Sequence, residues 1–307
     1  MGKTTIAWTH YSWNPWWGCT KVSTGCANCY AEAWDKRTGG SHWGKSERRF
    51  FGEKHWREPL KWNEAARKAG ERRRVFCASM ADVFEDAPGL DEQRRKLWLL
   101  IHKTENLDWL LLTKRPENIE RMYLDCYPWG SDPAPNVWLG TSVEDQDSAS
   151  ERIPHLLKVP ARVRFLSVEP LLRIVDLAVA GAFVTNGVAL RASRDSGDGV
   201  SWVIVGGESG PRARPCDVAW IRSIVEQCKA ANVPCFVKQL GSKPIEMVPR
   251  CGMPSLISGL LQDCGFQPDP GAVRDMEIAC ARVDLRDSKG ADPAEWPEDL
   301  RVQEFPT

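Results

Sequence analysis

The chain has 307 residues, of which 42% are hydrophobic and 27% charged, and its formal net charge is zero. This length suits one α/β barrel, which needs about 250 residues, and the composition is typical of a globular protein. No apolar run approaches the roughly 18 residues of a membrane-spanning helix. The N-terminus is too polar and aromatic for a signal peptide, so we expect a cytoplasmic location.

Six short apolar runs recur along the chain, and each ends in a polar or glycine-containing cluster. They are Val75–Cys77, Trp109–Leu112, Val137–Leu139, Val163–Leu166, Trp202–Val205 and Pro234–Val237, with Thr5–Trp8 as a seventh candidate. Amphipathic helical patterns separate several of them, at Asp91–Thr104, Pro116–Leu124, Ser148–Leu157 and Asp217–Asn232, the last with Asp217 as its N-cap. This alternation predicts a parallel sheet covered by helices.

We expect an α/β fold in the form of a complete or partial TIM-like (β/α) barrel over residues 1–241. An open doubly wound sheet gives the same local pattern, but it concentrates its ligand at one switch point. Here six strand ends carry reactive side chains, as in barrel enzymes. We expect a basic insertion at 35–74, an inserted loop or hairpin at 175–200, and a C-terminal extension, 242–307, packed on the barrel.

The charges are unevenly distributed along the chain. Residues 36–74 hold 13 Lys/Arg against 5 Asp/Glu, whereas residues 263–307 hold 5 against 11. The basic stretch includes Arg72-Arg73-Arg74 and interleaved aromatic residues, a composition that suits phosphates and bases and makes DNA or a nucleotide a candidate partner. An amphipathic cover for a neighbouring loop, with only the charges exposed, has the same composition.

Three cysteines lie close together near the N-terminus. Cys19, Cys26 and Cys29 have the spacing C-x6-C-x2-C in a loop that also contains Gly18 and Gly25. A structural zinc site prefers four ligands, whereas a four-iron cubane held by three thiolates keeps one iron open. We therefore expect an N-terminal iron–sulfur cluster loop, with zinc or unliganded thiols as alternatives. A deaminase would need a His-x-Glu motif, and the chain contains none.

Motifs along nearly the whole chain resemble those of a radical-SAM-like protein family of phages and prophages. They are T-I-A-W-T…W-N-P…G-C…G-C-x-x-C-Y at the N-terminus, then residues 113–116, 140–144, 167–170, 206–210, 237–241, 287–290 and 296–300. The commonest radical SAM pattern spaces its cysteines x3 and x2, with an aromatic residue before the last. Here the first gap is six, Asn28 occupies the aromatic position, and Tyr30 follows instead.

The resemblance implies a radical S-adenosylmethionine enzyme with a [4Fe–4S] cluster on Cys19, Cys26 and Cys29. An external electron donor would reduce the cluster, and the cofactor would yield a 5′-deoxyadenosyl radical. Gly206, Gly207 and Glu208 resemble the glycine-glycine-glutamate motif that holds the cofactor's amino group, although that motif usually lies on the second strand. We also expect Tyr30 at the cofactor.

Further candidate catalytic residues follow the predicted strands. Lys114 and Arg115 could clamp a carboxylate or phosphate, since arginine makes bidentate contacts. Equivalent positions at strand ends carry Glu144, Glu169 and Lys238. For Lys114 and Arg115 the alternative is a loop at a helix start with solvated charges. For Glu144, Glu169 and Lys238 the alternative is an ion pair of one with another. The competing function is a metal-stapled, DNA-associated binding protein without radical chemistry, and Cys251, Cys264 and Cys280 could hold a second cluster.

Overall fold

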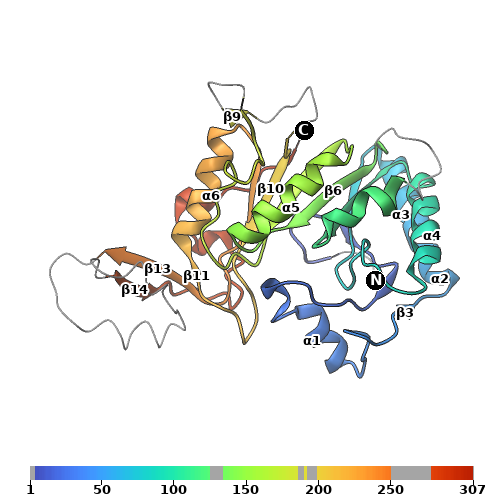
Figure 1. Ribbon diagram of the computed structural model, residues 1–307, viewed down its shortest axis with the longest axis horizontal. Coiled ribbons are helices and arrows are strands. Elements are labelled where there is room, and N and C mark those ends of the chain that lie inside the picture. The colour runs from blue at the N-terminus through green and yellow to red at the C-terminus, as the bar shows by residue number, and fades with distance from the viewer. Residues whose placement is uncertain (1–3, 125–133, 186–189, 192–198, 250–277, 307) are drawn as a thin grey trace.

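The computed structural model describes residues 4–124, 134–185, 190–191, 199–249 and 278–306 (Figure 1). Its centre is a seven-stranded parallel sheet whose spatial order follows the chain. In that order the strands are β1 (Tyr11–Ser12), β4 (Arg73–Cys77), β5 (Leu107–Thr113), β6 (Val137–Ser142), β7 (Val163–Val168), β10 (Trp202–Gly206) and β12 (Cys235–Gln239). All six predicted runs are therefore confirmed as strands.

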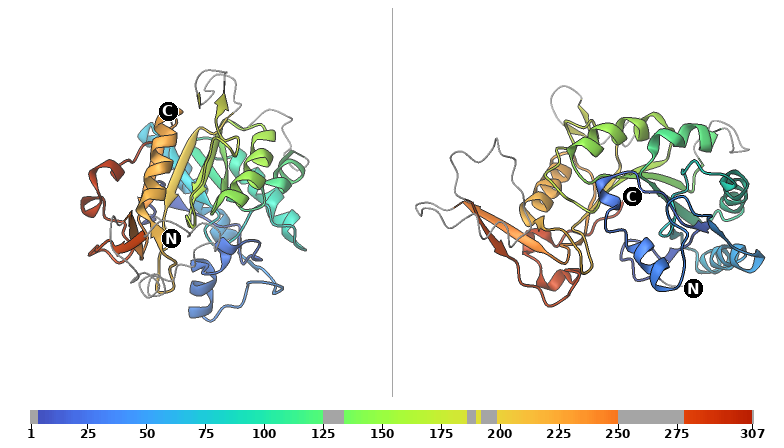
Figure 2. Two further views of the ribbon diagram at one scale, coloured as in Figure 1. Left: turned by 60° about the vertical axis from the view of Figure 1, so that its left-hand side comes forward. Right: turned by 60° about the horizontal axis from the view of Figure 1, so that its bottom comes forward.

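The order of the strands gives the sheet its shape. Crossovers between parallel strands are almost always right-handed, so an order that never reverses puts every connecting helix on the same face. The sheet curls away from these helices into a half-barrel (Figure 2). β1 and β12 are the two outermost strands of this sheet and do not pair with each other, so the barrel is partial. A doubly wound sheet would reverse its order at a switch point and is excluded.

Four helices of two turns or more cover the convex face. They are α3 (Glu58–Ala69), α4 (Leu90–His102), α5 (Gln146–Lys158) and α6 (Val218–Ala230). The Asp217 carboxylate caps α6 by accepting from the Ala219 N–H at 2.9 Å, as predicted. The predicted helix Pro116–Leu124 is instead a 3₁₀ turn (Pro116–Asn118) followed by a π turn (Glu120–Leu124).

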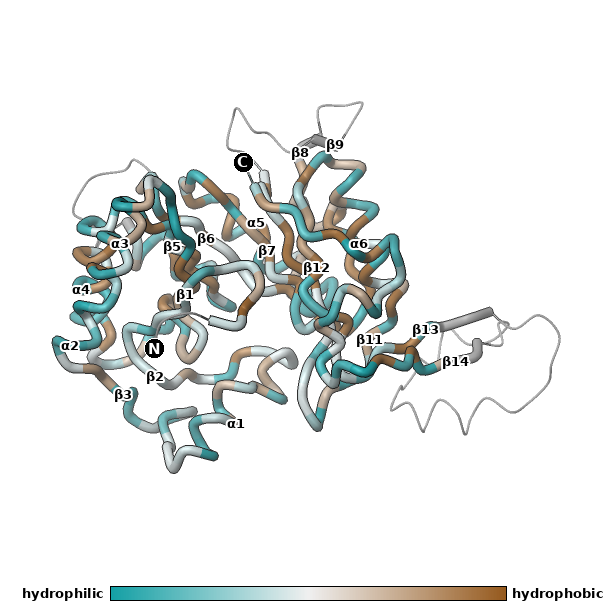
Figure 3. The backbone as a smooth tube through the Cα atoms, turned by 180° about the vertical axis from the view of Figure 1, so that it is seen from behind, coloured by the Kyte–Doolittle hydropathy of each residue, from teal (hydrophilic) through white to brown (hydrophobic). Residues whose placement is uncertain are grey.

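Side chains alternate along the strands between two cores. Val75, Trp109 and Val203 point outward into the core under the helices. A second cluster, which we call the aromatic plug, fills the concave face of the sheet. The central strands that contribute to it are largely hydrophobic (Figure 3). Its buried members are Trp8, Phe76, Leu110, Trp138, Val163, Phe165, Trp202, Ile204 and Phe236. Gly140 makes room for this packing, because a Cβ there would lie 2.4 Å from the Phe165 ring.

Two predictions about the N-terminal third are corrected by the structure. The first strand is Tyr11–Ser12 rather than Thr5–Trp8, because Trp8 leaves the sheet to fill the aromatic plug. The segment 35–74 is not wholly an insertion, since it contains α3, the crossover helix between β1 and β4, as well as α2 (Glu53–Trp56). It also contains β3 (Arg49–Phe50), which pairs with β2 (Trp16–Trp17).

The C-terminal part of the chain returns to the barrel. In a small sheet β11 (Cys216–Asp217) pairs with β13 (Pro244–Pro249), which pairs with β14 (Ile278–Arg282). The last described residues run along the free edge of β12, where the Val237 N–H donates to the Val302 carbonyl at 2.8 Å. Within 175–200, β8 (Val184–Thr185) and β9 (Leu190–Arg191) form a hairpin. Cys251 and Cys264 lie outside the described residues.

No helix among the described residues has the length and apolarity that crossing a membrane requires.

Candidate metal centre and adjoining cavity

The cysteine loop lies between β2 and α1 (Tyr30–Arg37), at the carboxyl ends of the central strands. Cys26 closes a 3₁₀ turn (Thr24–Cys26), and Cys29 directly precedes α1. The Gly18 N–H donates to the Met80 carbonyl at 3.0 Å, which joins the start of the loop to the segment after β4. Gly18 has a φ of 111° and a Cβ there would lie 2.1 Å from the His42 carbonyl oxygen, so the turn requires glycine.

Arg115, after β5, binds the first part of the loop. Its guanidinium donates to the Thr20 carbonyl at 2.6 Å and lies 3.6 Å from the Cys19 sulfur. The same group pairs with Asp82 at 2.9 Å, and the Asp82 carboxylate also accepts from the Thr113 hydroxyl at 2.7 Å. Arg115 is buried. The ends of β4 and β5 therefore hold Cys19 in place through a buried ion pair.

Glu144, after β6, binds the middle of the loop. Its carboxylate is fully buried, pairs with Arg152 at 2.8 Å and with Lys114, and accepts from the Ser23 hydroxyl at 3.1 Å. A Cβ on Gly25 would lie 2.4 Å from the Glu144 side chain, so the loop passes directly against it. Burial alone would raise the pKa of Glu144, but the charges of Lys114 and Arg152 hold it below its usual value.

Glu208, after β10, binds the last part of the loop. Its carboxylate accepts from the Arg214 guanidinium at 2.7 and 2.9 Å and from the Asn28 side chain at 3.1 Å. Arg214 in turn donates to the Thr24 carbonyl at 2.9 Å. Burial opposes ionisation of Glu208, but the hydrogen bonds from Arg214 outweigh it and lower the pKa. Gly207 lets this segment pack closely, since a Cβ there would lie 2.2 Å from the Leu240 carbonyl oxygen.

The thiols of the loop lie in a desolvated setting. Burial and the nearby Asp82 carboxylate raise the pKa of Cys19 to about 12, although Arg115 opposes them. Burial also raises the pKa of Cys29. The three thiols are free. Among the described residues, no three His, Cys, Asp or Glu side chains are grouped to hold a single metal ion.

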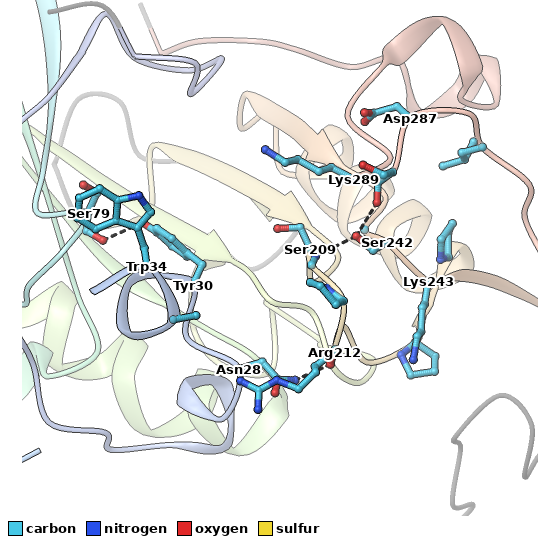
Figure 4. A pocket seen from close by; sticks show the side chains of 18 of the residues that line it. Asn28, Tyr30, Trp34, Ser79, Ser209, Arg212, Ser242, Lys243, Asp287 and Lys289 are labelled. Atoms are coloured by element: carbon cyan, nitrogen blue, oxygen red, sulfur yellow. Dashed lines mark hydrogen bonds between the residues drawn. The ribbon is translucent and has the colours of Figure 1, made fainter. Parts of the chain in front are cut away.

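A cavity of about 1310 Å³ adjoins the loop (Figure 4). Asn28 and Tyr30, the two neighbours of Cys29, line it together with Ser79 at the end of β4. The Tyr30 hydroxyl donates to the Ser79 carbonyl at 2.8 Å. The opposite wall comes from residues 209–212, 215, 241–245, 282, 283, 285 and 287–289. The aromatic plug fills the amino end of the half-barrel, so the open space lies at the end that carries the cysteines.

The structure brings the predicted site residues together in two groups. Lys114, Arg115, Glu144 and Glu208 surround the cysteine loop, and none of them lines the cavity. Glu169 and Lys238 form a separate pair at the ends of β7 and β12, with the Lys238 ammonium 2.7 Å from the Glu169 carboxylate. Tyr30 lines the cavity, whereas Gly206 ends β10 and Gly207 follows it, and neither glycine lines the cavity.

Sequence reasoning missed the partners that complete these contacts. Arg152 reaches Glu144 from α5, two turns beyond the strand end, and Arg214 returns to Glu208 through the turn at Gly210-Pro211. Asn28 stands where the commonest cysteine pattern has an aromatic residue, and here it binds Glu208. The Gly210-Pro211 pair, three residues before Arg214, indicates a turn but does not indicate this contact.

The arginines at 72–74 of the basic segment have partners within the protein. Arg72 pairs with Asp108 at 2.7 Å, Arg73 pairs with Glu71, and Arg74 stacks on Phe305 with its guanidinium carbon 4.0 Å from the ring centre. These three residues lie at the amino end of β4, opposite the cysteine loop. Trp62 stacks on Tyr11 with ring centres 4.4 Å apart. Arg72-Arg73-Arg74 therefore do not face the candidate site.

The fold and the site define an α/β half-barrel protein with a three-cysteine loop fastened to the carboxyl ends of its strands. Residues 3–262 match the family described as "Protein of unknown function (DUF5131)", and the chain belongs to this family. No curated protein matches the sequence. A mutant of spore photoproduct lyase is a similar solved structure, with 13% identity, a TM-score of 0.43, and coverage of 76% of this chain. The match spans 65% of that protein's length, which is less than two thirds.

Proposed function

We propose that this protein is a radical S-adenosylmethionine enzyme whose [4Fe–4S] cluster is bound by Cys19, Cys26 and Cys29. One observation carries the proposal. The three-cysteine loop is fastened to the carboxyl ends of parallel strands by Arg115, by the Glu144 network and by the Glu208–Arg214 pair, directly beside a large cavity. Half-barrel and barrel enzymes place their chemistry at this end of the sheet.

The donor set supports a cluster rather than a single ion. Structural zinc sites use four ligands that converge on one point. This loop offers three thiols, and among the described residues no three His, Cys, Asp or Glu side chains converge on one ion. A cubane takes one thiolate for each iron, so three thiols leave one iron for a further ligand. The Arg115 guanidinium beside Cys19 compensates thiolate charge in a desolvated site.

When bound, such a cluster supplies the electron for reductive cleavage of S-adenosylmethionine. The chain's own residues orient the parts and exclude water. Asn28 and Tyr30 carry the cysteine loop into the cavity wall, so a ligand in the cavity meets the side of the loop that bears Cys29. The Glu208 carboxylate fixes Asn28 and Arg214 and thereby the loop, so in this proposal Glu208 is a positioning residue as well as a candidate for the cofactor's ammonium.

The remaining candidates divide between holding the loop and meeting the substrate. Lys114 and Glu144 neutralise each other under the loop, and we assign them to positioning. Glu169 and Lys238 form a half-buried pair at strand ends that do not touch the loop in any contact among the described residues. A carboxylate and an ammonium in contact can take and return one proton, so this pair is our candidate for substrate chemistry.

The test is anaerobic purification followed by reduction with added S-adenosylmethionine. We expect a brown protein that forms 5′-deoxyadenosine, and Cys19→Ala, Cys26→Ala and Cys29→Ala variants that lose most of their iron. Cys77→Ala and Cys235→Ala are matched controls, because both side chains are buried in the strand core and should leave the iron content unchanged. A colourless protein that contains zinc would instead favour the metal-stapled binding protein.

A further inference from the structure

We infer that the cavity binds a segment of single-stranded nucleic acid, with phosphates on its basic side chains and a base beside Tyr30. This inference rests on the proposed function, since it names the substrate class of the same site. It does not use Arg72-Arg73-Arg74, which are already paired or stacked within the protein.

The first observation is the charge of the cavity wall. Five basic side chains line the cavity, and the one acidic side chain in its wall is Asp287. The basic residues are Arg37, Arg212, Lys243, Arg282 and Lys289. All five are exposed. Among the described residues, only Arg282 of these five has an ion-pair contact, a long one of 3.9 Å to Asp284. Cations that share a concave wall without counter-charges repel one another, and a bound polyanion relieves that repulsion.

The second observation is where these cations come from. Arg37 ends α1, Arg212 follows β10, Lys243 precedes β13, and Lys289 belongs to the segment after β14. Tyr30 and Trp34 lie on one side of the cavity, and Lys243, Ser242 and Lys289 on the other (Figure 4). Four of the five cations therefore come from one wall, and Arg37 comes from α1, which also carries Tyr30 and Trp34. Several cations from separate elements suit a chain of several phosphates better than one phosphate group.

The third observation is an available aromatic face. Tyr30 is 59% exposed, and its hydroxyl is fixed by the Ser79 carbonyl, so its ring is held in the cavity wall. None of the ring contacts among the described residues involves Tyr30. Aromatic rings held in basic grooves stack nucleobases with little sequence preference. Tyr30 follows Cys29 directly, so a base stacked there lies next to the cysteine loop.

S-Adenosylmethionine does not account for these features. The cofactor carries one carboxylate and no phosphate, so it leaves most of the cations without a partner. The cavity of about 1310 Å³ also exceeds the roughly 300–1,000 Å³ of an ordinary small-molecule pocket. It therefore has room for the cofactor together with part of a second ligand.

The experiment measures binding of a fluorescent single-stranded oligonucleotide to the anaerobically purified protein over a series of salt concentrations. The test variant combines Arg212→Gln, Lys243→Gln and Lys289→Gln. The matched control combines Lys54→Gln, Arg57→Gln and Lys61→Gln, which removes the same charge from exposed positions in the basic segment. Each phosphate contact contributes about 0.7 log units of affinity per log unit of salt, so the test variant should flatten the slope by about 2.

We expect the control to bind like the unchanged protein and Tyr30→Ala to bind about tenfold more weakly with the same salt slope. Absence of binding at low salt, or equal loss in the control, would overturn the inference, as would equally strong competition by mononucleotides. If circular dichroism shows that the triple variant is misfolded, the three single variants are measured instead. Each should then change the slope of log affinity against log salt concentration by about 0.7. Binding without cofactor cleavage would refute the proposed function alone, and cleavage without binding would refute this inference alone.

Discussion

Replacing Glu144 by Gln tests whether the buried charge network fastens the cysteine loop. The Glu144 side chain is 0% exposed and Arg152 only 6%, whereas Lys114 is 20% exposed. Removing one partner of a buried pair costs about 3–5 kcal/mol, because the other charge stays buried without compensation. Lys114 can reach water and Gln keeps one acceptor oxygen, so we expect the lower end, about 3 kcal/mol.

The assay is equilibrium urea unfolding followed by circular dichroism, with the iron content of the same preparations measured in parallel. The matched control is Glu92→Gln, because Glu92 pairs with Lys96 at 3.0 Å on the surface and is 71% exposed. Exposed pairs of this type contribute under about 0.5 kcal/mol. We expect Glu144→Gln to lose iron as well, since Ser23 in the loop loses a charged acceptor.

A double variant separates the charge effect from a general loss of packing. Lys114→Met combined with Glu144→Gln removes one of the two stranded cations, so it should be more stable than the sum of the two single effects predicts. The reasoning is refuted if Glu144→Gln costs less than about 1 kcal/mol and keeps its iron. Strictly additive effects would show that Lys114 and Glu144 act independently.

Three further predictions follow from other contacts. Arg115→Lys keeps the charge but loses the forked donors to Thr20 and Cys19, so a chelator should remove iron faster. The reduction potential of the cluster that remains should fall by tens of millivolts, since a tenfold change corresponds to about 59 mV for one electron. Trp202→Ala should cost about 3–5 kcal/mol in urea unfolding, because this ring is fully buried in the aromatic plug, whereas a cost below about 1 kcal/mol would show that the plug adapts. Burial lowers the pKa of His55 below 6.5, so the unfolded chain binds a proton more readily than the folded one. The free energy of unfolding should therefore fall as the pH drops below about 6.5. His55→Gln should make the urea midpoint less dependent on pH in this range, and an unchanged pH profile would contradict the prediction.

Much of the sheet could be predicted because its strands are buried on both faces. Runs such as Trp109–Leu112 are apolar on consecutive positions, which is typical of a parallel strand between two cores. The exception is the first strand. Thr5–Trp8 is as apolar as a strand, but Trp8 fills the plug, whereas Tyr11–Ser12 is too short to give a periodic signal.

The partners of charged side chains could not be predicted, because they come from distant parts of the chain. Arg72 and Asp108 are separated by 36 residues, and Arg214 and Thr24 by 190. A local composition therefore made 36–74 resemble a nucleic-acid surface although several of its charges are neutralised within the fold. Local spacing predicted the three cysteines of the loop, because they are near one another in sequence. Their role as cluster ligands stays a prediction.

The distribution of unpaired charge, which the sequence does not show, separates the two groups of candidate residues. At the strand ends, the Glu144 carboxylate pairs with Arg152 and the Glu208 carboxylate pairs with Arg214. The acidic charges around the loop are therefore neutralised by the protein itself. On the cavity wall the balance is reversed, since Arg212, Lys243 and Lys289 have no ion-pair partner among the described residues. The net charge of zero hides this difference. Acids are neutralised beneath the loop, and cations stay exposed beside it. This arrangement favours an anionic ligand in the cavity, next to Asn28 and Tyr30, which flank Cys29.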